Sequence, residues 1–192
     1  MSRTSGFFFM ASTSATNRSR LATLAALIAA SASTLGSLYL SLGLGLIACP
    51  LCFYQRCFAM AVLAMLAVGY CSPARSFGQL NILALGPTVA GGVVAAVHTY
   101  FDAIGQQICP DGLFGIGKTA QQSLASYILI GIPLAIGVEL DRRAGCTTRF
   151  AVLLAVVLGG TLAFACVIAS PQPPFLAEHH PLMCYRPIPA AE

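Results

Sequence analysis

The stretch LATLAALIAASASTLGSLYLSLGLGLIACPLCFYQR, residues 21–56, joins a long apolar run to a C-x-x-C pair and an arginine. The run from Leu21 to Ala48 carries no charged side chain and exceeds the roughly 20 residues that a helix needs to cross a bilayer. Cys49 and Cys52 follow directly, where a second apolar run begins. A cysteine pair at this spacing is a redox or metal-binding device, and its position places it at a predicted membrane surface.

The composition of the whole chain excludes an ordinary soluble domain. Of the 192 residues, 57% are hydrophobic and only 8% are charged, whereas a typical soluble domain has about 25% charged residues. The net charge of +4 is modest. The arginines are scattered between apolar runs and do not form the basic patch that binding of nucleic acid needs. We therefore expect an all-α, polytopic membrane protein.

Five apolar segments account for most of the chain. Inside lipid the backbone must satisfy its own hydrogen bonds, so each segment is expected to be a helix. The segments predict a helical bundle over residues 21–170, preceded by a disordered N-terminus, residues 1–20, and followed by a proline-rich tail, residues 171–192. The expected helices run from about Leu21 to Ala48, Cys52 to Tyr70, Phe77 to Phe101, Leu124 to Leu140 and Phe150 to Ser170.

Basic residues predict the orientation, because cytoplasmic loops are enriched in lysine and arginine. With a cytoplasmic N-terminus, most arginines fall on the cytoplasmic side: Arg3, Arg18, Arg20, Arg75, Arg142, Arg143 and Arg149. Only Lys118 and Arg186 then lie in outer segments. A cleaved signal peptide is the alternative for the basic start, although the apolar run is long for one. We expect outer loops near residues 49–52 and 102–123 and an outer C-terminal tail.

This topology sorts the eight cysteines by side. Cys49, Cys52, Cys109 and Cys184 face the outer compartment, where disulfides persist. The first two form the C-x-x-C pair, which leaves Cys109 and Cys184 as a pair by elimination. Their joining requires the tail to fold back over the second outer loop. The other four cysteines are expected to be reduced, buried or incidental.

Cys52 is expected in the first turn of the second helix, where the helix dipole favours the reactive thiolate. Arg56 lies on the same helix face, about 6 Å along the axis. Because arginine keeps its charge near lipid, Arg56 could hold a thiolate, a quinone carbonyl or the anion of a reduced quinone. The alternative is an arginine that anchors the helix to lipid head groups. Such a site could pass electrons from thiols outside a membrane to an acceptor dissolved in it.

His98 and Asp102 form a second polar group, one helical turn apart near the outer end of the third segment. His98 could supply a proton or a hydrogen bond to a reduced quinone oxygen. The alternative is a polar pair bonded at the membrane interface. His179, His180 and Cys184 could bind a metal, but their spacing is loose and no metal site is predicted.

The octapeptide CPLCFYQR, residues 49–56, between two transmembrane segments resembles the motif of the DsbB family of inner-membrane thiol:quinone oxidoreductases. The motif combines C-x-L-C with an aromatic residue, glutamine or glutamate, and arginine at the head of helix two. His98-Thr99 falls where that family tends to carry His-Thr near the quinone. The similarity spans about residues 21–125.

The resemblance implies a disulfide-generating enzyme of the bacterial inner membrane, with a four-helix core and here a fifth helix. It implies electrons taken from a periplasmic, thioredoxin-like DsbA partner and passed to ubiquinone or menaquinone. Cys52 would engage the quinone, with Arg56 and His98 as quinone contacts. Cys49 would exchange with the second cysteine pair, and Cys109 would form the mixed disulfide with DsbA.

The chain departs from the family pattern, in which both cysteines of the second pair precede helix four. That loop here contains Cys109 alone. Either Cys184 takes the missing role, or Cys109 works alone, or the relay differs. The predicted topology favours Cys184, because an extra helix brings the C-terminus outside.

Two other functions stay open. Vitamin K epoxide reductase homologues also place C-x-x-C beside a quinone in a helical bundle. Their active pair lies late in the chain, however, and the order here is reversed. A membrane protein that is not an enzyme and binds metal through C-x-x-C and His179-His180 is the other alternative.

Overall fold

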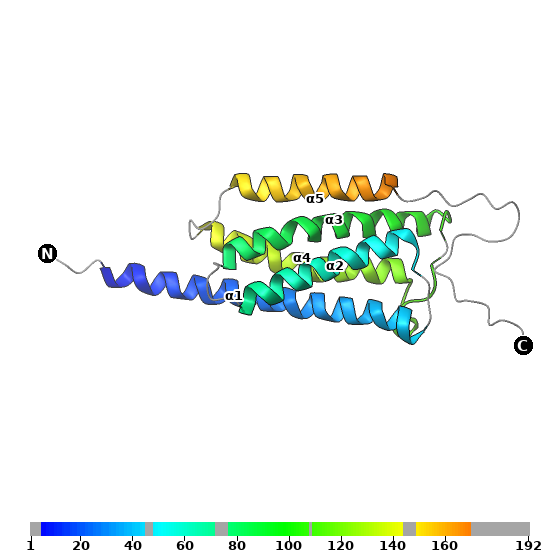
Figure 1. The fold of residues 1–192 in the computed structure, drawn as a ribbon. Helices are drawn as coiled ribbons and strands as arrows, with labels where there is room; N and C mark the ends of the chain where they lie inside the picture. The colour runs from blue at the N-terminus through cyan, green and yellow to red at the C-terminus, as the bar shows by residue number, and fades with distance from the viewer. Residues whose placement is uncertain (1–4, 45–47, 72–76, 108, 144–148, 170–192) are drawn as a thin grey trace, which may run out of the picture.

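The computed structural model describes residues 5–44, 48–71, 77–107, 109–143 and 149–169, with side chains from residue 17 onward. Helices that lie side by side and alternate in direction make up the fold (Figure 1), and no strand occurs in the described ranges. The predicted all-α bundle is confirmed. The helices are α1 (Ser5–Leu38), α2 (Pro50–Cys71), α3 (Phe77–Ala103), α4 (Thr119–Arg143) and α5 (Arg149–Ala169).

Five helices of the described chain are long and apolar enough to cross a membrane. Their number and order agree with the predicted segments, but their ends differ. α2 and α5 begin one or two residues early, at Pro50 and Arg149, and the first helix ends at Leu38 with a π-helical turn to Gly43, not at Ala48.

α1 and α4 begin five or more residues early. α4 starts at Thr119 instead of Leu124, because polar residues form its first turns. α1 starts at Ser5, so its backbone is helical over most of the stretch for which disorder was expected. No proline separates Ser5 from Leu21, so nothing in this stretch forces the helix to stop.

The α3 helix is the centre of the bundle. It packs against α2, α4 and α5, whereas α1 packs mainly against α4 and α2. Small residues permit these close contacts, as is usual between helices in membranes. A Cβ atom at Gly91 of α3 would overlap the Tyr127 ring of α4, and one at Gly159 of α5 would meet the backbone of α3 at Gly86.

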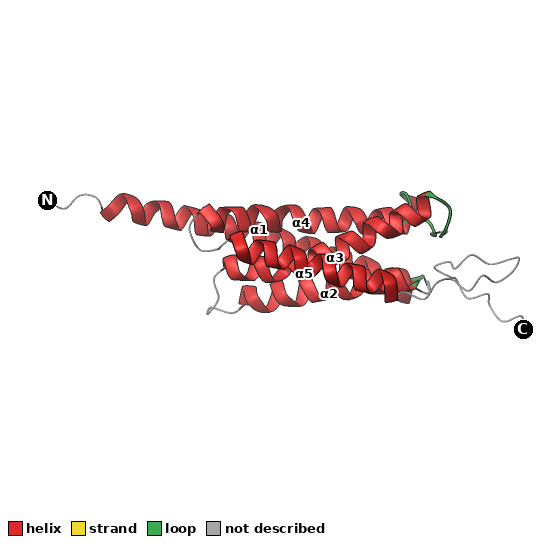
Figure 2. Cartoon of the chain, turned by 90° about the horizontal axis from the view of Figure 1, so that it is seen from above, coloured by secondary structure: helices red, strands yellow, loops and turns green. Residues whose placement is uncertain are grey.

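The α5 helix lies along the outside of α3 (Figures 1 and 2). Its contact with α2 is slight. Only Gly159 and Ala163 of α5 are buried. The fold is therefore a four-helix core of α1 to α4 with a fifth helix added on one face, as predicted.

A buried polar cluster ties α1, α3 and α4 together at the end of the bundle where α1 enters. Ser19 donates a hydrogen bond to Asp141 Oδ2 (2.9 Å), and Thr23 donates one to Asn81 Oδ1 (2.8 Å). The Asn81 amide completes the cluster at 3.3 Å from the same Asp141 oxygen. Because unpaired polar groups are costly in an apolar interior, these bonds favour one register of the three helices.

Candidate redox site

The C-x-x-C pair lies at the start of α2, at the opposite end of the bundle from the polar cluster. Pro50 opens the helix, a position that suits proline because no backbone N–H is needed there. Cys49 precedes it and caps the first turn: its carbonyl accepts from Phe53 N–H (2.9 Å), and its sulfur accepts from Cys52 N–H (3.3 Å). The two sulfurs lie 3.1 Å apart. The predicted place of Cys52 in the first helical turn is confirmed.

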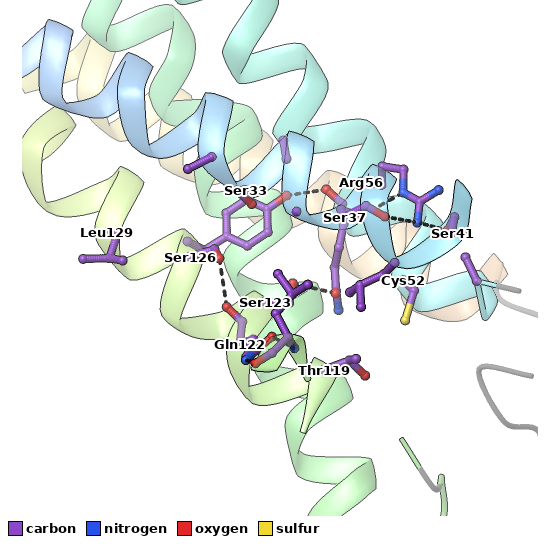
Figure 3. A pocket seen from close by; sticks show the side chains of 18 of the residues that line it. Ser33, Ser37, Ser41, Cys52, Arg56, Thr119, Gln122, Ser123, Ser126 and Leu129 are labelled. Carbon is purple, nitrogen blue, oxygen red and sulfur yellow. Dashed lines mark hydrogen bonds between the residues drawn. The ribbon is translucent and has the colours of Figure 1, made fainter. Parts of the chain in front are cut away.

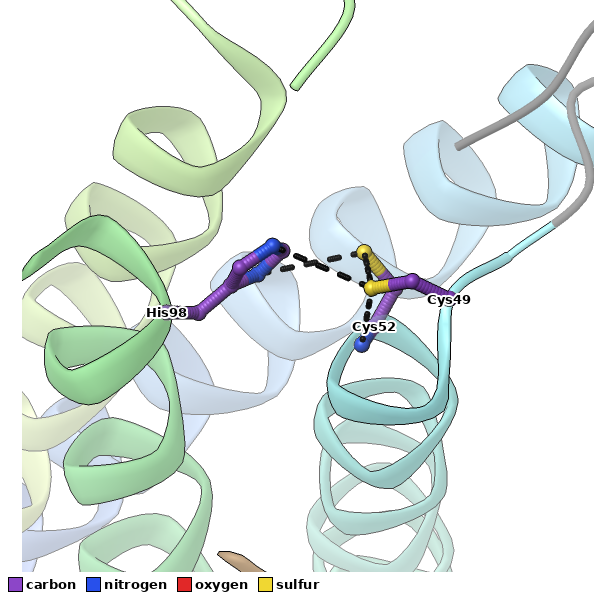
Figure 4. Close-up of side chains that lie close together, drawn as sticks. All are labelled: Cys49, Cys52 and His98. Atoms are coloured by element: carbon purple, nitrogen blue, oxygen red, sulfur yellow. Dashed lines mark hydrogen bonds between the residues drawn. The ribbon is translucent and has the colours of Figure 1, made fainter. Parts of the chain in front are cut away.

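His98 of α3 points toward the sulfur atoms of Cys49 and Cys52, and only 1% of its surface is exposed (Figure 4). Its Nε2 atom lies 3.8 Å from Cys49 Sγ and 3.1 Å from Cys109 Sγ. Its Nδ1 atom lies 3.9 Å from Cys52 Sγ. One imidazole therefore contacts all three described cysteines of the predicted outer face, which were expected to form two separate groups.

The loop that carries Cys109 is held onto the end of α3. The Cys109 N–H donates to Asp102 Oδ1 (3.1 Å), and Lys118 Nζ donates to the Cys109 carbonyl (3.1 Å). The Thr119 N–H donates to the Pro110 carbonyl (3.1 Å). Asp102 thus positions the loop through this backbone contact. Cys109 is 3% exposed, and its sulfur is held beside the imidazole of His98.

Gln55 orients the imidazole from the side away from Cys109. Ser123 of α4 donates to its Oε1 atom (2.7 Å), which leaves the amide nitrogen facing His98 Nδ1 at 3.2 Å. An amide nitrogen is a donor, so Nδ1 accepts and Nε2 carries the proton. That N–H faces Cys49 and Cys109. From the sequence, Gln55 was expected only as part of the CPLCFYQR motif. Its signal was a glutamine one turn after Cys52 in an apolar helix.

A cavity of about 280 Å³ lies between α1, α2 and α4 (Figure 3). This volume is near the lower end of the range for small-molecule sites, roughly 300–1,000 Å³. Cys52 lines the cavity, whereas Cys49 and His98 do not. The C-x-x-C pair therefore has one cysteine on the cavity and the other toward Cys109. Small and apolar residues form part of the wall: Ala29, Ala32, Gly36, Leu40, Ala48, Ala59, Leu113 and Leu129. Polar side chains complete it, among them Ser33, Ser37, Ser41, Gln122, Ser123, Ser126 and Tyr127.

Arg56 also lines the cavity, and its hydrogen-bond partners are on α1. It donates to Ser37 Oγ (2.9 Å), to the Ser37 carbonyl (3.0 Å) and to Ser41 Oγ (2.6 Å). No carboxylate pairs with Arg56 in the described part of the chain. Arg56 and Cys52, which the helical spacing placed on one face of α2, therefore line the same cavity.

The cavity has the donor set that a quinone requires. The guanidinium of Arg56 can donate to a carbonyl oxygen, and the small apolar wall accommodates a flat ring. Thr119 Oγ1, which lies in the same lining, is buried and has no hydrogen-bond partner among the described residues. A ligand oxygen would satisfy it. The residues present therefore fit such a group.

Three further cysteines lie in the described part of the chain. Cys57 and Cys71 are exposed on α2, and Cys166 is half-buried on α5. Cys184, like His179 and His180, lies outside the described residues. The predicted pairing of Cys184 with Cys109 therefore stays a prediction.

The comparisons with known proteins agree with this architecture. A family model described as disulfide bond formation protein DsbB matches residues 19–170, which include α2 to α5 and most of α1. No curated protein and no solved structure matches the chain. The chain therefore belongs to the DsbB family of disulfide bond formation proteins, and with its five apolar helices it is a membrane oxidoreductase of disulfide formation.

Proposed function

We propose that the chain is a thiol:quinone oxidoreductase that reoxidises a DsbA-like, thioredoxin-fold dithiol protein of the periplasm. Electrons would pass through Cys109, Cys49 and Cys52 to ubiquinone or menaquinone. One observation carries the proposal: Cys52 lines an apolar cavity with Arg56, whereas Cys49 and Cys109 meet at the imidazole of His98. The site thus has a thiol side and a lipid-soluble acceptor side.

The cysteine end of the bundle is proposed to face the periplasm of a bacterial inner membrane. The opposite end carries Arg18, Arg20, Arg142, Arg143 and Arg149, whereas Lys118 lies at the cysteine end. Cytoplasmic segments are the ones enriched in basic residues. A cytoplasmic N-terminus and an outer C-terminus follow, and the outer side supports disulfide chemistry.

Thiol exchange can begin with the Cys49–Cys52 disulfide of the oxidised protein. The Cys109 thiolate attacks Cys49 Sγ, so that a Cys49–Cys109 bond forms and Cys52 leaves as a thiolate on the cavity side. The Nε2–H of His98, 3.1 Å from Cys109 Sγ, stabilises the attacking anion by donating to it.

The partner dithiol then completes the exchange. Its first thiolate attacks Cys109 and releases Cys49, and its second thiol resolves the mixed disulfide. The partner leaves oxidised, and Cys49 and Cys52 hold two electrons and two protons. Three cysteines are enough for this cycle; Cys184 would extend it by storing a further disulfide with Cys109.

The cavity residues act on the acceptor side. A bound quinone would supply the chemistry of accepting two electrons and two protons. Arg56 would hold a ring oxygen by donating to it, and the Thr119 hydroxyl provides a second polar contact. His98, whose contacts are to sulfur, would act on the thiols more directly than on the ring.

The test is an assay with purified, oxidised, full-length protein in detergent. Reduced thioredoxin-fold dithiol protein and a short-chain ubiquinone are added, and quinone absorbance is followed together with partner thiols. We expect one partner disulfide for each quinone reduced. Quinone loss at the rate measured without the protein would contradict the proposal. Non-reducing peptide mapping separates the vitamin K epoxide reductase alternative, because a link from Cys109 to Cys49 or Cys184 supports the present one.

Arg56→Met should raise the KM for quinone by about tenfold or more, because a hydrogen bond to a charged group contributes roughly 1.5–3 kcal/mol. Arg56→Lys should give a smaller rise, since lysine keeps the charge but not the planar fork. Steady-state rates at varied quinone concentration measure both. The rate at which the partner reduces the protein in a single turnover should not change.

Arg18→Ala is the matched control, because Arg18 is an exposed arginine at the other end of α1. Its KM should equal that of the unmodified protein. If both Arg56 variants keep the KM of the unmodified protein for quinone, then Arg56 only anchors α2 to α1.

A further inference from the structure

Three thiols and one imidazole converge on a small volume at the redox site. Cys49, Cys52 and His98 each offer a donor atom within 4.8 Å of the others. Cys109 Sγ adds a fourth donor, 3.1 Å from His98 Nε2. The set of three cysteines and one histidine is one of the sets that bind zinc in tetrahedral sites.

The separations among Cys49, Cys52 and His98 approach those around a tetrahedral ion, and Cys109 is adjacent to His98. With Zn–S bonds of about 2.3 Å and Zn–N bonds of about 2.0–2.1 Å, ligand atoms lie roughly 3.5–3.8 Å apart. The Cys49 sulfur is 3.8 Å from His98 Nε2, and the Cys52 and Cys109 sulfurs are 3.1 Å from Cys49 Sγ and His98 Nε2, respectively. The first distance is at the upper limit of the required range and the other two lie below it. Cys109 Sγ is not within 4.8 Å of all three of the other donor atoms, so its loop must move toward the C-x-x-C pair for the four ligands to surround one ion.

The surroundings bury two of these donors and support a third. Cys49 and Cys109 are 6% and 3% exposed. Gln55 provides the outer contact, since a metal-bound histidine usually donates its other N–H to an oxygen. If the Gln55 amide turns over, its Oε1 accepts from His98 Nδ1, and the Ser123 hydroxyl accepts from the amide nitrogen.

We infer that the reduced chain binds one Zn²⁺ through Cys49, Cys52, Cys109 and His98. The three thiols release their protons on binding, and no electron moves. A sulfur in the Cys49–Cys52 disulfide is no longer a thiolate ligand, so oxidation and zinc binding exclude each other. Zinc therefore holds the chain in its reduced state. This regulatory consequence rests on the proposed function, whereas the zinc site itself does not.

Zinc binding is measured on full-length protein reduced with a phosphine and kept without oxygen. After equilibration with Zn²⁺ and removal of excess, metal analysis should give one zinc per chain. Cys109→Ser and His98→Gln should each weaken binding at least tenfold. Gln55→Ala should weaken it by roughly 10–100-fold, as loss of an outer contact does. Cys57→Ala, an exposed cysteine of the same helix, should bind like the unmodified chain.

Each of these binding measurements either supports the zinc site or overturns it. Less than one zinc per reduced chain, equal binding by the oxidised chain, or unweakened binding by Cys109→Ser would overturn the inference. Misfolding of His98→Gln leaves the decision to Cys109→Ser, which changes one loop atom.

A second arm tests regulation. Zinc-loaded reduced protein should form no Cys49–Cys52 disulfide with quinone until a chelator is added; oxidation at the metal-free rate would refute the regulatory role. Failure of metal-free protein to reduce quinone would instead contradict the proposed function and leave the zinc site intact.

Discussion

Cys52→Ala should abolish quinone reduction by a reduced dithiol partner, lowering turnover on the order of 10³-fold or more, as removal of a reacting nucleophile does. Cys52 is the only described cysteine whose side chain lines the cavity between α1, α2 and α4. Without its sulfur, the electron pair released by thiol exchange has no thiolate beside the acceptor. Cys49→Ala should be equally inactive, because the disulfide that Cys109 attacks can no longer form.

Peptide mapping distinguishes the role of Cys52 from that of Cys49, although both variants should be inactive in the turnover assay. In Cys52→Ala, the chain should accumulate a Cys49–Cys109 disulfide under mild oxidation, visible by non-reducing peptide mapping. Cys49→Ala cannot form that link. Cys57→Ala is the control, since its cysteine is exposed on the same helix and should keep full turnover. If both Cys49→Ala and Cys52→Ala stay active, the thiol:quinone proposal is wrong.

Cys109→Ser should separate the protein substrate from small thiols. Turnover with the thioredoxin-fold partner should fall about 10³-fold, because Cys109 is the sulfur proposed to form the mixed disulfide. Quinone reduction driven by dithiothreitol should stay within about tenfold of the unmodified chain, since a small dithiol can reach the half-buried Cys52 directly. Both rates are read from quinone absorbance in the same preparation.

The same assay decides the role of Cys184. If Cys184 stores a disulfide with Cys109, then Cys184→Ser should show the same loss with the protein partner. If Cys109 works alone, Cys184→Ser should turn over like the unmodified chain. Partner-driven turnover that survives in Cys109→Ser would remove Cys109 from the relay altogether.

The fold could be predicted from the chain almost completely. Each membrane-spanning helix is a local property, because an apolar stretch of sufficient length must be helical in lipid whatever its neighbours are. The errors lie where that argument stops. The mostly polar stretch from Thr119 to Ser123 was assigned to a loop, yet it forms the first turns of α4. Thr119, Gln122 and Ser123 of this stretch line the cavity.

The candidate site could be predicted only in part. Spacing was enough to place Cys52 in the first turn of α2 and Arg56 one turn later. It was not enough to identify their partners. Arg56 binds Ser37 and Ser41 of α1, and His98 contacts the sulfur atoms of three cysteines, which the spacing did not indicate. The quinone contacts expected of Arg56 and His98 stay predictions.

Hydropathy, charge and motif spacing act along the chain, and they were sufficient for the number of helices, the bundle class and the position of the C-x-x-C pair. The meeting of Cys49, His98 and Cys109, the Gln55–Ser123 contact and the cavity beside Cys52 depend on residues from different helices. Such contacts arise when side chains of separate helices pack together, and packing depends on shape in three dimensions. The redox chemistry of a cysteine pair was therefore readable in the sequence, but the neighbours that direct it were decided by the tertiary structure.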